Sequence, residues 1–275
     1  MAELAPSSLA GKRVVITRSA SQCEALAREL SERGAIPVIL PLVSFAVPED
    51  FAPLDSAITQ IERFDWLILT SAQAVRAVAQ RAAELERPLM RKGSKLRIAA
   101  VGPVTAEAAR QAGLPIKHVA MTHNGVALAD ELGRRLQGVN VFLPRSDRAN
   151  PDLPAALKLH GAQVTEVIAY RTLRQAEVDQ ESLRKIAEGG ADAILFFSPS
   201  AVQHFSELFG VGQLRTLQDK LDLTAVGPVT AGALREAGVE RMVIASDTTA
   251  MAVVAALEKH SANAPKQSAA GVKRG

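Results

Sequence analysis

The chain has 275 residues, of which 48% are hydrophobic and 4% aromatic, enough apolar material for one large domain or two of ordinary size. The net charge of +3 fits an anionic partner, but no basic block lies beside aromatic residues and no zinc-finger spacing occurs, so we expect no nucleic acid. The single cysteine, Cys23, excludes an internal disulfide framework. Because neither a signal-like start nor a membrane-length apolar run is visible, we expect a cytoplasmic protein without membrane contact.

In chain order, the first half alternates short apolar strands with helices. After a loose leader at 1–10, we expect a strand at 14–17, a helix that Gly34 ends, and an extended stretch over 36–45. The elements expected next are a helix at 54–63, a strand at 66–70, a helix up to 85, a charged loop at 86–95, a strand and helix over 97–112, a strand at 118–121 and a helix at 125–136.

At Gly138 the same pattern starts again. Arg145 repeats Arg18 at a spacing of 127 residues (145 − 18 = 127), and Gly161 repeats Gly34 at the same spacing. The elements expected in this half are a strand at 141–146, an extended stretch through 167–172, a helical connector, a strand at 193–197, a second strand-turn-helix near 225–238, a strand at 241–245 and a helix at 250–259. Residues 261–275 are small and polar, and we expect a disordered tail.

The strongest signal is a segment of seven residues, AVGPVTA, which occurs at 100–106 and again at 225–231. Each copy reads as a buried strand, a Gly-Pro turn and a short helix that Gly113 or Gly238 ends. Glycine permits close approach to the backbone, and the start of a helix presents free N–H groups to an anion. Two such turns predict a ligand site built from Gly102, Thr105, Gly227 and Thr230, unless both are structural turns that a duplication preserved.

The alternation of strands and helices predicts an α/β fold: two similar, doubly wound, flavodoxin-like domains with parallel sheets, produced by internal duplication. Ligands of such sheets lie beyond the carboxyl ends of the strands, where the candidate residues Arg18, Ser71, Gly102, Arg145, Ser198 and Gly227 fall. Arginines there suit carboxylates but can equally be solvated. The two serines can cap helices, bind an anion, or do both.

Other kinds of site have little support in the sequence. The five histidines are scattered without metal-ligand spacing. Neither a dinucleotide fingerprint nor a phosphate-binding Walker sequence is present, and there is no nucleophile elbow. We therefore expect no metal and no cofactor. Tyr170, the only tyrosine, is either a packing residue or a functional one.

Taken together, these motifs resemble the uroporphyrinogen-III synthase family. The segments that carry the resemblance span residues 11 to about 258 and are VVITRS (14–19), LTSAQAV (69–75), AAVGPVTA (99–106), VIAYRT (167–172), FFSPSAV (196–202) and TAVGPVTAGALREAG (224–238). Each motif is short, and the order and spacing of the set give it its specificity.

The resemblance implies two α/β domains with an active site in the cleft between them. A linker of two strands near 41–46 and 167–172 would join the domains, with crossed connectivity. The first domain would comprise residues 1–43 and 171–260, and the second residues 44–170, which leaves the tail at 261–275.

The family reaction takes the linear tetrapyrrole hydroxymethylbilane, removes water, inverts the terminal ring and closes the macrocycle to uroporphyrinogen III, without metal or cofactor. The resemblance makes Tyr170 the catalytic candidate, as a donor to the departing hydroxyl. Thr230, Ser71 and Ser198 match family residues, and Ser200 joins the expected substrate-binding set with Arg18, Gly102, Thr105, Arg145 and Gly227. We expect a monomer that binds a polyanionic tetrapyrrole, with a transient contact to the preceding pathway enzyme.

A second function class is a non-catalytic, two-lobed α/β protein that binds an anionic small molecule, like a periplasmic receptor or the sensor core of a regulator. The expected absence of a signal peptide disfavours the receptor, and the absence of a DNA-binding segment disfavours the regulator. A purely structural interaction protein would not need the paired Gly-Pro-Val-Thr turns.

Overall fold

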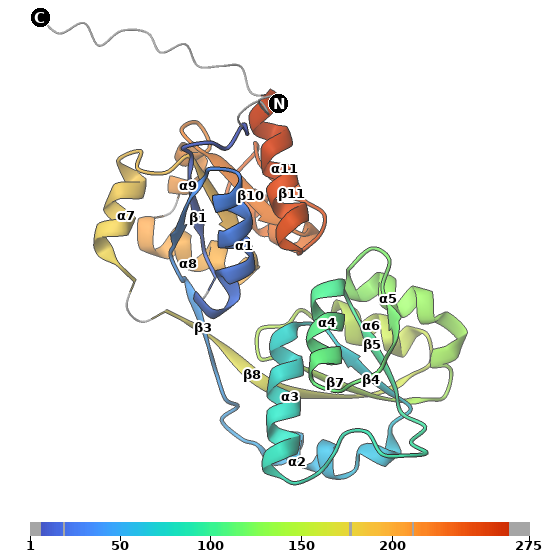
Figure 1. Cartoon of the computed structure of the whole chain (residues 1–275). Helices are drawn as coiled ribbons and strands as arrows, with labels where there is room; N and C mark the ends of the chain where they lie inside the picture. The colour runs from blue at the N-terminus through green and yellow to red at the C-terminus, as the bar shows by residue number, and fades with distance from the viewer. Residues whose placement is uncertain (1–6, 19, 176–177, 211, 264–275) are drawn as a thin grey trace, which may run out of the picture. The chain divides into compact units, whose positions relative to one another are not determined.

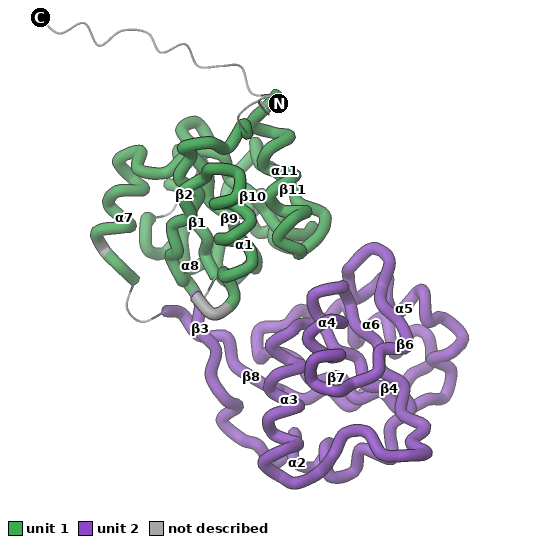
Figure 2. Tube along the Cα trace, viewed as in Figure 1, with its two compact units in different colours: residues 1–42, 176–275 green, residues 43–175 purple. Residues whose placement is uncertain are grey.

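A computed structural model describes residues 7–18, 20–175, 178–210 and 212–263 (Figure 1). The chain divides into two compact units, one from residues 1–42 and 176–275 and the other from residues 43–175 (Figure 2). Both are of the mixed α/β type, with parallel strands and covering helices. Most of the expected tail, residues 264–275, lies outside the described residues.

Unit 1 combines elements from both ends of the chain. They are β1 (Arg13–Ile16), α1 (Ala20–Glu32), β2 (Ile36–Ile39), α7 (Gln180–Ala187), β9 (Ala193–Phe196), α8 (Pro199–Phe209), α9 (Gln213–Leu217), β10 (Asp222–Val226), α10 (Pro228–Glu236), β11 (Val243–Ala245) and α11 (Ala250–Asn263). Within the described residues they form a parallel five-stranded sheet in the order β2-β1-β9-β10-β11. The first strand of the chain therefore lies inside this sheet.

Alternate side chains of these strands enter two separate cores. Val15, Ile194 and Phe196 face one side, where they pack with residues of α8 and α10. Ile16 and Leu195 face the other side, with residues of α1 and α11. Strands buried on both faces read as continuous apolar runs, which is why the sequence identified them.

Residues 7–10 and 261–263 are more ordered than the sequence indicated. Leu9, in the expected loose leader, is fully buried, and Ser7 Oγ donates to Glu258 Oε1 at 2.6 Å. Helix α11 runs to Asn263, beyond its expected end at 259, and Lys12 Nζ donates to Ser261 Oγ at 3.0 Å. The expectation of a tail from 261 is therefore wrong for residues 261–263, which belong to a helix that Ser7 and Lys12 contact.

Unit 2 is continuous in sequence. Its elements are β3 (Val43–Ala46), α2 (Ala52–Thr59), the 3-10 helix η1 (Ile61–Arg63), β4 (Trp66–Leu69), α3 (Ala72–Glu84), β5 (Arg97–Ala100), α4 (Pro103–Gln111), β6 (Ile116–Val119), α5 (Gly125–Leu132), the 3-10 helix η2 (Gly133–Leu136), β7 (Asn140–Ser146), α6 (Asp152–Leu159) and β8 (Gln163–Arg174). Five strands are parallel, in the order β8-β7-β4-β5-β6, and β3 pairs antiparallel with the end of β8.

The same strand order underlies both units. In unit 1 the first to fifth strands are β1, β2, β9, β10 and β11. In unit 2 the corresponding strands are β7, β8, β4, β5 and β6. With this numbering the parallel strands of each sheet lie in the order 2-1-3-4-5, which is the flavodoxin-like order. In that order the direction of winding changes between the first and third strands. These are β1 and β9 in unit 1, and β7 and β4 in unit 2.

The expected extended stretch over 36–45 is two strands, β2 and β3, separated by Leu40, Pro41 and Leu42. Proline lacks the N–H that a continuous ladder needs. Leu42 is the last residue of unit 1 in the first segment of the chain. Its carbonyl oxygen accepts a hydrogen bond from Nδ1 of the buried His204 on α8. Strand β8 continues unbroken to Arg174, so unit 2 extends a few residues beyond the expected boundary at 170.

We predict that residues 43–175 fold when expressed alone, because both faces of their sheet have their own apolar core. Circular dichroism and a cooperative urea transition would measure this. The matched fragment, residues 176–263 without 1–42, should not fold, because it lacks β1 from the middle of its sheet. A disordered 43–175 fragment would contradict the prediction.

Candidate functional site

The carboxyl edge of unit 2 brings together Ser71 and Tyr170, which lie 99 residues apart. Ser71 follows β4 and caps α3, and its Oγ accepts a hydrogen bond from Ala74 N at 3.0 Å. The same Oγ lies 3.1 Å from the phenolic oxygen of Tyr170 on β8. Ser71 also lies where the winding of the sheet changes, the place at which α/β sheets bind ligands.

The phenol of Tyr170 is largely enclosed. The residue is 8% exposed, and its ring meets the Phe45 ring edge to face, with centroids 5.5 Å apart. Burial, helped by the charge of Asp147, raises the pKa of Tyr170, although the hydroxyls of Ser71 and Ser146 and the charge of Arg145 oppose this. At neutral pH the side chain is therefore a neutral phenol, able to donate a hydrogen bond but slow to lose its proton.

Arg145 does not have the environment that the sequence suggested. Its residue is 4% exposed, its Nη1 donates to Glu166 Oε1 at 2.8 Å, and its Nη2 donates to the carbonyl oxygen of Asn150. Burial lowers the pKa of this guanidinium, against the effect of Glu166. An external carboxylate would have to compete with Glu166, and substrate binding by Arg145 stays a prediction.

A polar network beside Tyr170 was missed by sequence reasoning. Ser146 Oγ lies 2.8 Å from Thr172 Oγ1, and Asp147 Oδ1 accepts from Thr172 N at 2.9 Å. The network lies next to a register shift between β7 and β8, where Arg145 pairs with Ile168 but Ser146 pairs with Tyr170. The PRSDR segment at 144–148 shows that polar residues end the strand, but a bulge of one residue leaves no mark in the sequence.

The carboxyl edge of unit 1 joins three of the expected residues. The Arg18 guanidinium carbon lies 4.4 Å from the centroid of the Phe197 ring. The next residue, Ser198, caps α8 by accepting from Ala201 N at 3.2 Å, and Ser200 is half-buried in the first turn of that helix. Because β1 and β9 are neighbours, Arg18 and Ser198 lie at the point where the winding of this sheet changes.

The two signature turns have different backbones. Gly227 has φ 88° and ψ 158°, a conformation essentially restricted to glycine, whereas Gly102 has an extended φ of −157° that any residue adopts. Both begin helices with proline in the first turn, and Gly113 and Gly238 follow the helices with positive φ, as the sequence predicted. The two identical sequences therefore adopt different backbone conformations at their glycines.

The signature threonines point inward. Thr105 and Thr230 are 6% and 3% exposed, and the exposed side chains of the second turn are Pro228 and Val229. The sequence suggested hydroxyls on the ligand side, but the third residue of each helix faces its sheet. Their part in ligand binding stays a prediction.

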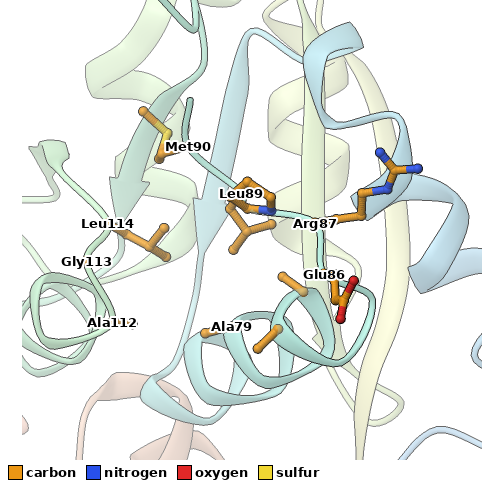
Figure 3. A pocket seen from close by; sticks show the side chains of 11 residues that line it. Ala79, Glu86, Arg87, Leu89, Met90, Ala112, Gly113 and Leu114 are labelled. Carbon is orange, nitrogen blue, oxygen red and sulfur yellow. The ribbon is translucent and has the colours of Figure 1, made fainter. Parts of the chain in front are cut away.

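A cavity of about 400 Å³ lies at the other ends of α3 and α4 (Figure 3). Leu89, Met90 and Leu114 line it, and none of the expected site residues does. Within the described ranges, no group of three histidine, cysteine or acidic side chains is placed to hold a metal ion. No helix of the described chain is long and apolar enough to cross a membrane.

We predict that Gly227→Ala lowers the free energy of unfolding by about 1–3 kcal/mol, because alanine is strained at that φ and ψ. The matched change, Gly102→Ala, should stay within about 0.5 kcal/mol, since its added Cβ would lie 3.7 Å from His123 Cβ in ordinary contact. Urea unfolding followed by circular dichroism gives both values. Equal losses would show that the two turns have the same conformation.

We also predict that the phenol titrates above its ordinary pKa near 10. Absorbance at 295 nm reports Tyr170 alone, because the chain has one tyrosine. Ser71→Ala should raise the midpoint further, since the serine hydrogen bond lowers this pKa. The folded state holds the proton more tightly than the unfolded state, so this stabilisation is complete below pH ~10 and is lost above the folded pKa. A lower midpoint in Ser71→Ala would refute the assignment.

Comparison with known proteins places the chain in a family. The family model described as Uroporphyrinogen-III synthase HemD matches residues 24–255. The chain is 30% identical to the uroporphyrinogen-III synthase of Synechococcus elongatus over 206 residues, 74% of this chain and 77% of that protein. It is 24% identical to the Chlorobaculum parvum enzyme over 83% of this chain and 91% of that one.

Two solved structures share the fold. A mutant uroporphyrinogen III synthase from the extremely thermophilic bacterium Thermus thermophilus has a TM-score of 0.61 at 23% identity, covering 90% of this chain and 100% of that chain. The uroporphyrinogen-III synthetase from Helicobacter pylori has a TM-score of 0.57 at 15% identity, with 90% and 99% covered. A family match over most of the chain and a relative at 30% identity over about three quarters of both chains show that the chain belongs to the uroporphyrinogen-III synthase family.

Proposed function

We propose that this chain carries out the reaction of its family, the dehydrative closure of hydroxymethylbilane to uroporphyrinogen III with inversion of the terminal ring. The observation that carries the chemistry is the pairing of Tyr170 with Ser71 at 3.1 Å, where the winding of the sheet changes. Membership of the family favours this enzyme over a non-catalytic anion-binding protein.

The chemical step that needs help is the departure of the hydroxyl group. As its carbon–oxygen bond breaks, the oxygen must receive a proton or a strong hydrogen bond to leave as water, and Tyr170 supplies the donor. The raised pKa of this phenol makes complete proton transfer costly, so hydrogen bonding is the larger part of its action. If the proton does move, Ser71 and the charge of Arg145 stabilise the phenolate, as their effects on the pKa indicate.

The remaining task is conformational. The free substrate closes to the uninverted isomer, so the protein must hold one folded conformer while ring closure proceeds. The substrate carries eight carboxylates, and helix starts can bind such groups through backbone N–H groups. We assign this role to the starts of α3, α4, α8 and α10, with Ser71, Gly102, Thr105, Ser198, Ser200, Gly227 and Thr230, and to the side chain of Arg18.

We further propose that the two units are domains that arose by duplication of one flavodoxin-like unit. The shared 2-1-3-4-5 order supports this, as do the repeated motifs at spacings of 125 and 127 residues. Strands β3 and β8 would then be the linker, because the chain leaves unit 1 just before β3 and returns to it after β8.

The test of the function is a product analysis. The purified protein is supplied with freshly made hydroxymethylbilane, and chromatography of the oxidised products separates isomer III from isomer I. Isomer III should predominate. Isomer I alone, as in the reaction without protein, would refute the proposed function.

We predict that Tyr170→Phe lowers kcat by about 10²-fold or less, with little change in KM, because only the donor oxygen is lost and water or a substrate carboxylate can partly replace it. The ring packing against Phe45 remains, so the thermal midpoint should hardly move. Initial rates of isomer III formation measure the effect. Unchanged kcat would leave Tyr170 a packing role only.

A further inference from the structure

A groove of about 280 Å³ runs along α3 on the side that faces the chain between Phe45 and Phe51. One wall is helical and includes Gln73 and Arg76. The other includes the side chains of Phe45 and Phe51, and Tyr170 contributes to the lining. Tyr170 is thus shared: its hydroxyl meets Ser71 at the carboxyl edge, while part of the residue borders the groove.

Most of the charged groups in this groove are already paired. Arg81 forms two hydrogen bonds with Asp55, at 2.6 and 2.7 Å, and one with Glu84 at 2.8 Å. Its guanidinium also lies 4.2 Å from the centroid of the Phe51 ring. Gln80 donates to Glu84 at 2.9 Å. These contacts fix the far end of the groove and leave no free charge there.

The end near Tyr170 is different. Among the described residues, no side chain forms an ion pair or hydrogen bond with Arg76 or with Gln73. Three residues apart on α3, they lie on one face of the helix. The groove therefore combines aromatic residues with an unpaired guanidinium and an unpaired amide at the end near Tyr170.

We propose that this groove is a subsite for one pyrrole ring of the substrate, with Arg76 and Gln73 binding the carboxylate of one of its acidic arms. The inference rests on the proposed function. The volume suits a single substituted ring rather than a tetrapyrrole, since pockets for larger ligands exceed about 300 Å³. The aromatic walls match the flat ring, and a guanidinium matches a carboxylate.

The subsite gives Arg76 a role as a specificity-determining residue. A ring bound here would lie against Tyr170, the residue whose hydroxyl acts on the departing group. Of four similar rings, the one held in this groove would be fixed with respect to the donor. Loss of the carboxylate contact should weaken binding, because the contact is present in ground state and transition state alike.

The first experiment measures binding without turnover. The whole, 15N-labelled protein is titrated with a monopyrrole that carries one acetate and one propionate arm. Amide signals of residues 73, 76 and 170 should shift, and Arg76→Gln should weaken binding about three- to fivefold, as expected for a solvent-exposed ion pair. Added salt should weaken binding to the wild type more than to the variant. Arg135→Gln, an exposed arginine on η2, is the matched control and should leave the affinity unchanged.

Three results would overturn the proposal: shifts confined to residues outside the groove, equal affinity in Arg76→Gln and wild type, or equal binding of the uncharged dimethyl ester.

The second experiment is kinetic, and Arg76→Gln should raise KM for hydroxymethylbilane about three- to fivefold with kcat nearly unchanged. An unchanged KM in an active enzyme refutes the subsite alone. A wild type that makes no isomer III while the groove still binds the monopyrrole refutes the function and not the groove.

Discussion

Burial of the parallel strands on both faces is the constraint on which the rest of the structure depends. Helices cover both sides of each sheet, and strands such as β4 and β9 have no exposed face on which chemistry could occur. In such strands polar groups that can be solvated or can bind a ligand lie at the ends. The 2-1-3-4-5 order then selects a position along that edge. Arg18 with Ser198, and Ser71 with Tyr170, lie where the winding changes.

Strand β8 carries Tyr170, the catalytic candidate, and pairs with both β7 and β3. Its first part is the edge strand of the parallel sheet and pairs with β7, and its last part pairs in antiparallel with β3. Tyr170 lies at the junction of the two, where a register shift pairs it with Ser146. The same burial that raises the phenol pKa also keeps its ring fixed against Phe45, so the placement of the donor and its weak acidity have one physical cause.

Sequence patterns were sufficient for features that depend on periodicity. The apolar runs gave strands such as 66–69, the glycines gave helix ends at Gly113 and Gly238, and the serines after strands gave the caps of α3 and α8. Features that depend on a partner from a distant part of the chain could not be predicted from the sequence. Arg145 is paired with Glu166 on the neighbouring strand, and the different conformations of Gly102 and Gly227 arise within identical heptapeptides. Local sequence cannot encode either.

The position of β1 inside the first sheet has a consequence for biosynthesis. A nascent chain that has emerged as far as residue 175 contains all of the second sheet, but the strands that flank β1 on one side have not yet been made. Another 21 residues must be translated before β9 is complete (196 − 175 = 21), which takes roughly 1–4 s at about 5–20 residues per second. During that interval the apolar segment 14–16 lacks its partner β9. Translation that stops early would therefore release one finished unit attached to an unpaired, aggregation-prone strand.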